Sequence, residues 1–399
     1  MPRVAVVASH PVQYQAPWFR ALAKVVDLEV FLCHRQDAHG QREAGFGNAF
    51  DWDVPLLEGY RFHWLNNISP SPGVNAFGGC DTPEIGDRLR EGRFDGCLVQ
   101  GWYLKSYMQA IQACWRQRIR LLVRGDSNLK TPRSRLKSAL KYLPYRWFLN
   151  RIDAHLYVGD ANREYLRSYG VPDSRLFFAP HFVDNGFFRR GAEIARQSGE
   201  RVRMREELGV PQDATVLLYV GKFIEVKRPL DVIRANARIR HESIHTVLVG
   251  SGPLEHVMRS EATSSRAPVS FWGFRNQTQL PACYAAADAL VVPGCETWGL
   301  VANEAMASGL PVIVSSSVGS AADLISEGST GFVYPEGDID ALAATMTATR
   351  RRLMESGPAV AQAVAERIDR YTAAAAAEGL LSALATPTMP RKQTFVEVS

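Results

Sequence analysis

Short runs of consecutive apolar residues recur along the whole chain, separated by stretches with the spacing of amphipathic helices. The runs are continuous rather than alternating, which is typical of strands buried on both faces of a parallel sheet. In the first half they are Val4–Ala8, Leu28–Cys33, Cys97–Val99, Ile119–Val123, His155–Val158 and Leu176–Ala179. In the second half they are Thr215–Val220, Thr246–Val249, Val269–Trp272, Ala289–Val292, Pro311–Val314 and Gly331–Tyr334. Strands alternating with helices predict an α/β fold of two doubly wound, Rossmann-like domains.

The break between the two domains falls near residues 186–213. Arg189–Arg205 is charged and poor in large apolar residues, and Gly209–Asp213 has the composition of a loop that leads into a new first strand. Two parallel sheets side by side direct their carboxyl edges at one another, so a ligand is expected in the cleft between them. The predicted divisions are a first domain at 1–186, a linker at 187–213, a second domain at 214–370, a C-terminal helix at 371–385 and a loose tail at 386–399.

The composition is that of an ordinary soluble globular protein, with 46% hydrophobic and 22% charged residues among 399. No apolar run reaches the roughly 18 residues that a membrane span needs. The N-terminal residues read as a strand rather than a signal peptide. Six cysteines without a C-x-x-C motif argue against a disulfide framework or a structural zinc site. These features predict a cytoplasmic protein.

The net charge of +5 is unevenly distributed. Between Arg116 and Arg151, eleven lysines and arginines face one acid, so this stretch carries +10 and the rest of the chain −5. Such local basicity disfavours a nucleic-acid partner and directs attention to one surface. Within residues 130–151, one apolar helical stripe has basic residues on its flanks, and its members are Leu136, Leu140, Leu143 and Trp147. The stripe fits peripheral contact with the anionic inner face of the cytoplasmic membrane, and it equally fits packing on the protein's own sheet.

The segment from Val292 to Ile313 carries the richest candidate chemistry. A strand ends at Pro293, a glycine-containing loop follows, and a helix is expected to begin near Gly299. The first backbone amides of such a helix, here those of Gly299, Leu300 and Val301, have no acceptor within the helix and form an anion site. Two acids, Glu296 before the helix and Glu304 within it, could contact different parts of one ligand, while the helix dipole alone also favours acids near a helix start.

This segment closely resembles the signature of glycosyltransferase family 4, the retaining enzymes with the GT-B architecture, in its Glu-x7-Glu spacing and the Ala-Met-Ala-Ser-Gly-Leu-Pro-Val-Ile that follows. Other blocks occur in the family's order. Val220–Lys227 resembles the glycine–basic–x4–Lys motif, and Leu248–Pro253 resembles the strand and G-x-G-P turn. Phe271–Phe274 and Leu280–Asp288 resemble the strand and helix that come next. The match is dense over residues 215–335.

The resemblance implies a role for each matching residue in binding a nucleotide-sugar donor. Lys222 and Lys227 would neutralise the donor diphosphate and stabilise it as a leaving group, so no metal and no cofactor are expected. Glu296 would face the donor sugar, and Glu304 would accept hydrogen bonds from the ribose hydroxyls. The phosphate and base would be held by Gly221, Gly250, Phe274, Gly299, Leu300 and Val301.

The first domain departs from the family. After the first strand the family has a pair of glycines, whereas this chain has Ser9–Gln15, in which His10 and Gln13 are candidates for acceptor or sugar contacts. Many family members also carry a histidine after the fourth or fifth strand of this domain. The corresponding stretch here, Leu122–Asn128, has none, and Arg124 and Asp126 are the polar residues that stand in its place.

Two metal-site motifs do not fit their surroundings. His241-Glu-Ser-Ile-His245 has the H-E-x-x-H spacing of zinc proteases, but it lies between a basic helix end and a strand, so the two histidines need not share a helical face. Asp51-Trp-Asp53 has the D-x-D spacing of metal-using transferases, but no apolar strand precedes it. We predict no metal site.

Together these features predict a retaining glycosyltransferase that moves a sugar from a nucleoside diphosphate to an acceptor hydroxyl. Bacterial surface polysaccharide or lipid-linked glycan assembly is the expected setting, with a glycan, lipid-linked or small-molecule acceptor. Three alternatives stay open at this point. They are a GT-B-fold nucleotide-sugar epimerase or phosphorylase, a natural-product glycosyltransferase, and a non-catalytic nucleotide-binding partner subunit.

Overall fold

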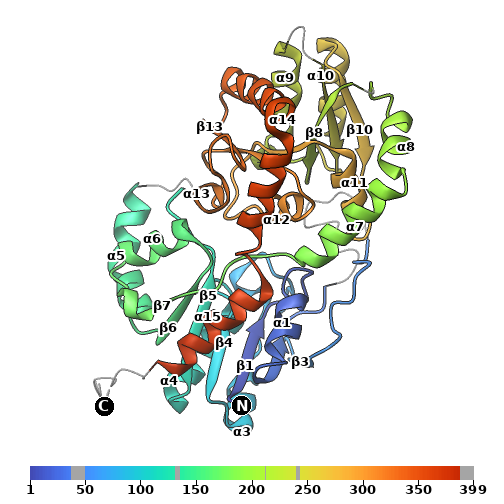
Figure 1. Cartoon of the computed structure of the whole chain (residues 1–399). Coiled ribbons are helices and arrows are strands. Elements are labelled where there is room, and N and C mark those ends of the chain that lie inside the picture. The colour runs from blue at the N-terminus through green and yellow to red at the C-terminus, as the bar shows by residue number, and fades with distance from the viewer. Residues whose placement is uncertain (37–49, 131–134, 212, 240–242, 387–399) are drawn as a thin grey trace.

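The computed structural model describes residues 1–36, 50–130, 135–211, 213–239 and 243–386, which form two α/β domains stacked end to end (Figure 1). Each domain is built on one parallel sheet. The sheet of the first domain has the order β3-β2-β1-β4-β5-β6-β7, and that of the second has the order β10-β9-β8-β11-β12-β13. In each sheet the order reverses beside the first strand of the domain, which is the switch point where doubly wound folds bind ligands. The predicted fold class is therefore confirmed.

The twelve apolar runs of the sequence each overlap an observed strand. The strands are β1 (Arg3–Ala8), β2 (Asp27–Leu32), β3 (Arg61–Trp64), β4 (Gly96–Val99), β5 (Arg120–Gly125), β6 (Ala154–Tyr157), β7 (Leu176–Phe178), β8 (Thr215–Val220), β9 (Ile244–Val249), β10 (Val269–Gly273), β11 (Ala289–Val292), β12 (Val312–Ser315) and β13 (Gly331–Tyr334). Among the strands of the described residues, β3 alone is missing from the prediction. It is an edge strand in which exposed and half-buried residues alternate, so it carries no continuous apolar run.

Helices cover the faces of both sheets. Those of the first domain are α1 (Ala16–Leu22), α3 (Ile85–Gly92), α4 (Lys105–Gln117), α5 (Arg135–Leu149) and α6 (Asp160–Ser168). Those that follow are α7 (Asn185–Gln197), α8 (Glu200–Glu207), α9 (Pro229–Arg238), α10 (Glu255–Ser265), α11 (Leu280–Ala286), α12 (Leu300–Ala307), α13 (Ala321–Leu324), α14 (Ile339–Ile368) and α15 (Ala373–Ala385). Short 3-10 turns lie at η2 (Phe77–Gly79), η3 (Asp173–Arg175) and η4 (Glu225–Lys227).

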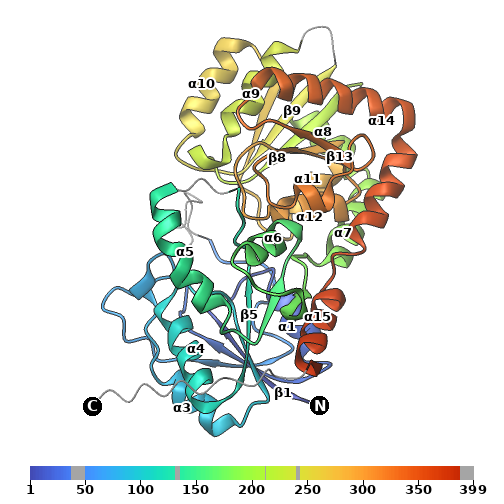
Figure 2. The same cartoon turned by 90° about the vertical axis from the view of Figure 1, so that its left-hand side faces the viewer.

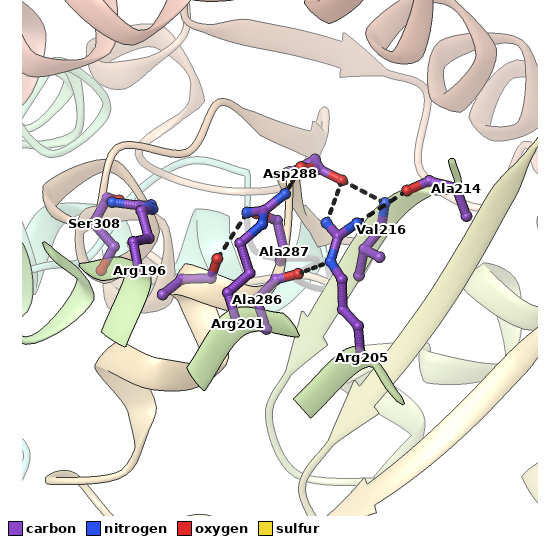
Figure 3. A network of polar contacts seen from close by, with 10 residues as sticks. Arg196, Arg201, Arg205, Ala214, Val216, Ala286, Ala287, Asp288 and Ser308 are labelled. Atoms are coloured by element: carbon purple, nitrogen blue, oxygen red, sulfur yellow. Dashed lines mark hydrogen bonds and ion pairs between the residues drawn. The ribbon is translucent and has the colours of Figure 1, made fainter. Parts of the chain in front are cut away.

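The segment predicted as a linker, 187–213, is instead an integral part of the second domain, because it contains most of α7 and all of α8. Helix α7 packs against α11 and α12, and α8 packs against α11. Two of the arginines that suggested a linker, Arg201 and Arg205, instead take part in a polar network at the C-terminal end of α11 (Figure 3). Arg201 and Arg205 of α8 both bind the carboxylate of Asp288, each at 2.7 Å, and Arg205 also donates to the carbonyl of Ala286 at 2.8 Å.

The chain returns to the first domain at its C-terminal end. Helix α14 runs along the second domain, and α15 then packs against α1, β6 and β7 of the first (Figure 1). The backbone of α15 lies so close to β7 that a Cβ on Gly379 would stand 2.0 Å from the carbonyl oxygen of Phe178, so only glycine fits there. Residues 387–399 of the predicted tail lie outside the described residues.

One hydrophobic core is shared by the two domains. It runs from one face of the first sheet, at Leu98 and Leu122, to one face of the second, at Val216 and Val312. A separate core lies on the other face of each sheet. The shared core holds the carboxyl edges of the two sheets opposite each other, and the candidate site lies between them.

Candidate functional site

A cavity of about 230 Å³ lies between the domains, at the carboxyl ends of β8, β9 and β11. The second domain contributes most of its lining, and the first domain contributes Gln13, Tyr14 and Trp52. Nine residues singled out in the sequence line this cavity, namely Gln13, Gly221, Lys222, Lys227, Gly250, Phe274, Glu296, Val301 and Glu304. Residues that are up to 291 positions apart in the chain are thus brought together at one site.

Glycines at the strand ends allow the cavity's loops to pack backbone against backbone. Gly250 follows β9 with φ +142°, and a Cβ there would stand 1.9 Å from the carbonyl oxygen of Gly221. A Cβ on Gly294, after β11, would stand 2.3 Å from the carbonyl oxygen of Val226. Any larger residue at these two positions would separate the loops that carry Lys222, Lys227 and Glu296.

Two lysines and one acid form the charged end of the cavity. The ammonium of Lys227, at the end of η4, makes a close ion pair with Oε1 of Glu296, from the loop after β11. Burial, and next the charge of Lys227, lower the pKa of Lys222, while Glu296 opposes that shift. Because the two lysines outnumber the acid, this end of the cavity is electropositive and suits an anionic ligand.

The start of α12 faces the same region. Gly299 directly precedes the helix with φ +94°, a backbone conformation that favours glycine. The first amides of α12, at Leu300 and Val301, have no acceptor within the helix, which makes this end suitable for an anion. Val301 lines the cavity, whereas Gly299 and Leu300 lie just before it in the chain and outside the lining.

Glu304 lies one turn into α12, where it is 1% exposed. Its Oε2 accepts a hydrogen bond from the hydroxyl of Tyr284 at 2.6 Å, and its Oε1 accepts one from the hydroxyl of Tyr14 at 3.1 Å. Burial raises the pKa of Glu304 to about 7, against the lowering effect of these hydrogen bonds. Tyr14 belongs to the first domain, so the carboxylate connects the two domains inside the cavity.

The other first-domain candidates lie outside this cavity. His10 is half-buried and pairs through Nδ1 with the hydroxyl of Ser9 at 2.9 Å, and burial lowers its pKa to about 4. The buried guanidinium of Arg124 donates to the carbonyl of Pro180 at 2.8 Å and lies 4.6 Å from the ring of Trp18. Arg124 therefore holds β5 against the segment after β7. Asp126 reaches the second domain and accepts a hydrogen bond from the hydroxyl of Thr297 at 2.7 Å.

A half-buried histidine lies close to Arg124 and Asp126, the residues that stand where the family resemblance expected a histidine. His181, in the segment after β7, has its Nδ1 3.2 Å from the guanidinium of Arg124 and its Nε2 3.9 Å from the carboxylate of Asp126. Its ring centroid is 5.7 Å from that of Trp298. His181 comes from a different strand end than Leu122–Asn128, so reading that stretch alone could not find it.

Several cavity residues were not expected from the sequence. They are Tyr14, Trp52, Ile224, Ser251, Arg275, Gln277 and Leu280, together with the strand-end residues Val220 and Val249. Arg275 directly follows Phe274 and Gln277 comes two positions later, so the block that contains Phe274 was the available signal for them. Tyr14 and Trp52 carry no comparable signal, because their approach to the second domain is a property of the assembled fold.

The histidine and the aspartates that the structure describes in the H-E-x-x-H and D-x-D strings lie outside the cavity. Across the described ranges, no group of three or more His, Cys, Asp or Glu residues is arranged to hold a metal ion. Of the H-E-x-x-H string, His241 and Glu242 lie outside the described residues. His245 lies within β9, with its Nε2 2.8 Å from the hydroxyl of Ser270. Asp51 and Asp53 are exposed and bind residues of the second domain instead.

Helix α5 lies on the outside of the first domain (Figure 2), and three of its apolar side chains are exposed. Leu140 and Leu143 are each 71% exposed and Trp147 is 59% exposed. These three members of the predicted stripe therefore do not pack on the sheet. Leu136 belongs to the part of α5 whose side chains the structure does not describe. No helix within the described ranges is long and apolar enough to span a bilayer.

Comparison with known proteins gives consistent matches. Residues 200–351 match the family described as glycosyl transferases group 1. The chain is 34% identical over 232 residues to D-inositol 3-phosphate glycosyltransferase 2 of Catenulispora acidiphila, covering 54% of this chain and 52% of that protein. It is 36% identical over 143 residues to the uncharacterized glycosyltransferase MJ1607 of Methanocaldococcus jannaschii, covering 34% and 36%. The chain thus spans about half or less of the length of these curated relatives.

Solved structures match over nearly the whole chain. Anabaena Alr3699/HepE, in complex with UDP and glucose, superposes with a TM-score of 0.70 at 16% identity, covering 97% of this chain and 100% of that one. A glycosyltransferase from Rickettsia africae ESF-5 superposes with a TM-score of 0.73 at 12% identity, covering 96% and 97%. At these identities the likeness establishes the fold. Residues 200–351 are thus similar to the glycosyl transferases group 1 family, and the chain as a whole has the two-domain GT-B fold.

Proposed function

We propose that this protein is a retaining glycosyltransferase that moves a hexose from a nucleoside-diphosphate donor to a hydroxyl of an acceptor. The observation that carries the proposal is that Lys222, Lys227, Glu296 and Glu304 line one cavity between the domains. Two cations suit a diphosphate, and a carboxylate suits the paired hydroxyls of a ribose. Anabaena Alr3699/HepE, which has the same fold, is described in complexes with UDP and with UDP-glucose.

In the proposed complex, the diphosphate lies between the two lysines and the first amides of α12, and the ribose lies against Glu304. As the bond between the anomeric carbon and the phosphate oxygen breaks, negative charge develops on the diphosphate. Lys222, Lys227 and the helix amides stabilise this charge. No metal is required in this arrangement, so a chelator such as EDTA is expected to leave the rate unchanged.

The transfer itself joins the acceptor oxygen to the anomeric carbon on the face that the phosphate leaves. The acceptor proton passes to an oxygen of the departing diphosphate, so the anomeric configuration is retained. Glu296 is the carboxylate that the family resemblance assigns to the donor sugar, and it forms an ion pair with Lys227. We therefore assign it to orienting the sugar and Lys227, rather than to forming a covalent intermediate.

The acceptor is proposed to belong to a surface polysaccharide or a lipid-linked glycan, assembled at the inner face of the cytoplasmic membrane. The exposed stripe Leu140, Leu143 and Trp147 supports this setting, since apolar side chains beside basic ones suit an anionic bilayer surface. Lys141 and Arg146 are exposed on the same helix. Contact through α5 would bring the first domain, which is proposed to bind the acceptor, to the membrane surface.

Product analysis tests the proposal directly. The purified protein is incubated with UDP-, GDP-, ADP- and TDP-hexoses, with EDTA present, and with either a membrane lipid extract or small-molecule alcohols. The proposal expects nucleoside diphosphate to be released only when an acceptor is present, and the new glycosidic bond to keep the donor's configuration. Sugar isomerisation without an acceptor would point to an epimerase, and a need for inorganic phosphate would point to a phosphorylase. Nucleotide binding without any turnover would favour a non-catalytic subunit, and each of these three results would contradict the proposal.

A further inference from the structure

We propose that the first domain supplies a wall of the donor's nucleobase pocket, with the indole of Trp52 as the surface on which the base stacks. This inference rests on the proposed function, because it assumes a nucleotide donor. It goes beyond that function in assigning base recognition to a residue of the domain that is expected to bind the acceptor.

The segment that carries Trp52 is tied to the second domain by its own hydrogen bonds. The side-chain amide of Asn276 donates to the carbonyl of Asp51 at 2.7 Å. The backbone amide of Thr278 donates to the carboxylate of Asp53 at 3.1 Å, and the Thr278 hydroxyl donates to the same carboxylate. The residues on either side of Trp52 are therefore both anchored to the loop after β10.

Aromatic contacts bring the same segment to the expected base end of the cavity. The ring of Phe50 lies 4.6 Å from that of Phe274 and 5.0 Å from that of Trp52, measured between centroids. Phe274 and Gly250 are the residues that the family resemblance places around the base. Trp52 lines the cavity together with both of them.

Trp52 lines two cavities. Its side chain is half-buried, and it lines both the donor cavity and a second cavity of about 390 Å³ in the first domain. The second cavity is also lined by Arg35 and Trp64, whose side chains stack with the guanidinium carbon 4.8 Å from the ring centroid. Trp52 thus forms the partition between the two cavities. An indole in that position offers a planar face that any nucleobase can stack on.

Base stacking on Trp52 would couple donor binding to the arrangement of the domains. The diphosphate and the ribose are held by the second domain, while the base contacts a residue of the first. A bound nucleotide therefore adds a bridge between the domains, beside those that Asp51 and Asp53 already make.

The test compares two substitutions of similar bulk, Trp52→Phe and Trp52→Leu, because only the first keeps an aromatic face. Dissociation constants for UDP, GDP, ADP and TDP are measured by calorimetry, and unfolding temperatures confirm that each variant folds. We expect Trp52→Leu to weaken binding of the preferred nucleotide by about 5- to 150-fold and Trp52→Phe to stay close to the wild type. Trp64→Leu, which changes the lining of the second cavity but not that of the donor cavity, serves as the matched control and should bind normally.

Two results would overturn the inference. One is unchanged binding by Trp52→Leu, which would leave the base without a contact to the first domain. The other is equal weakening by both Trp52 variants, which would mean that the indole supports the loop rather than the base. Failure of the wild type to bind any of the four nucleotides would be a different result, since it would contradict the proposed function itself.

Discussion

At the scale of single residues, Glu304 is the group whose surroundings are most unusual for its type. A fully buried carboxylate is costly unless it is hydrogen-bonded, and here two tyrosine hydroxyls, one from each domain, donate to it. Burial still raises its pKa to about 7. In the proposed complex the ribose hydroxyls donate further hydrogen bonds to this carboxylate and so stabilise its charged form.

This pKa predicts a pH dependence of stability. Because the folded-state pKa lies above the ordinary value of 4.5, the folded protein holds the proton more tightly than the unfolded chain. The free energy of unfolding should therefore fall as pH rises from about 4.5 to 7, by on the order of 3 kcal/mol from this group. Glu304→Gln removes this titrating group. The unfolding temperature of the variant, measured relative to that of the wild type, should therefore rise between pH 5 and pH 8. Glu261→Gln, at a surface ion pair with Arg234, is the control, and parallel curves for Glu304→Gln and wild type would refute the prediction.

Substitution of Lys227 is predicted to lower the turnover number of sugar transfer. Removal of one group that stabilises developing negative charge typically costs about 100-fold or more in kcat. We expect Lys227→Ala to show a loss of this size in sugar transfer. Lys105→Ala, which removes a lysine paired with Asp81 on the surface of the first domain, should transfer sugar at the wild-type rate. A kcat for Lys227→Ala equal to that of the wild type would remove this lysine from the site.

The sequence pointed to most of the second-domain half of the site, because its residues lie on short strand–loop–helix units. Lys222 and Lys227 follow β8, and Glu296 and Glu304 flank the start of α12, so local spacing determines where they lie. The first-domain half depends on how the domains are joined. Gln13 was predicted and lines the cavity. Its neighbour Tyr14 was not predicted, and its hydroxyl donates to Glu304, 290 positions away in the chain. No local pattern encodes such a contact.

At the scale of elements, strands were predictable because burial on both faces requires continuous apolar runs. Residues 187–213 show the limit of this reasoning. Their arginines were read as the sign of an exposed linker, but two of them pack their guanidinium groups onto carbonyls at the end of α11 (Figure 3). Charge along a helix does not reveal whether its partners are solvent or a neighbouring helix end.

The network on α11 predicts a large loss of stability for Asp288→Ala. This carboxylate binds Arg201, Arg205 and the backbone amide of Val216, and the side chain of Arg205 is only 8% exposed. Removing the acid leaves a buried cation without its counter-charge, which costs about 3 kcal/mol or more. Urea unfolding should show this, whereas Glu261→Ala at the exposed pair with Arg234 should cost about 1 kcal/mol or less. Equal costs for the two variants would contradict this account of α8.

The exposed apolar side chains of α5 lead us to predict that the protein binds anionic vesicles. We expect the wild type to sediment with vesicles that contain phosphatidylglycerol and to remain in solution with purely phosphatidylcholine vesicles. The double variant Leu143→Ser, Trp147→Ser should lose most of this binding, because both side chains are exposed and apolar. Ile194→Ser, at a 63% exposed apolar residue of α7, is the matched control. Equal sedimentation of the double variant and the wild type would exclude α5 as the contact.

At the scale of the whole molecule, several hydrogen bonds join the two domains. The ammonium of Lys130 donates to the carbonyl of Val318 at 3.0 Å, and the amide of Asn128 donates to the carbonyl of Thr297 at 2.9 Å. A third hydrogen bond between the domains runs from the backbone amide of Asp160 to the carboxylate of Asp323, at 3.1 Å. The two-domain arrangement was predictable from the repeated strand pattern, but these contacts were not, because they depend on the relative position of two separately folded units.

Thermal unfolding with UDP, GDP, ADP and TDP shows whether this cavity binds a nucleoside diphosphate. A ligand present at about one hundred times its dissociation constant adds roughly 2.7 kcal/mol of stability. We expect a rise in the unfolding temperature of the wild type with one of the four nucleotides, and a much smaller rise for Glu304→Gln. The absence of any rise with all four nucleotides, or an equal rise in the variant, would contradict this expectation.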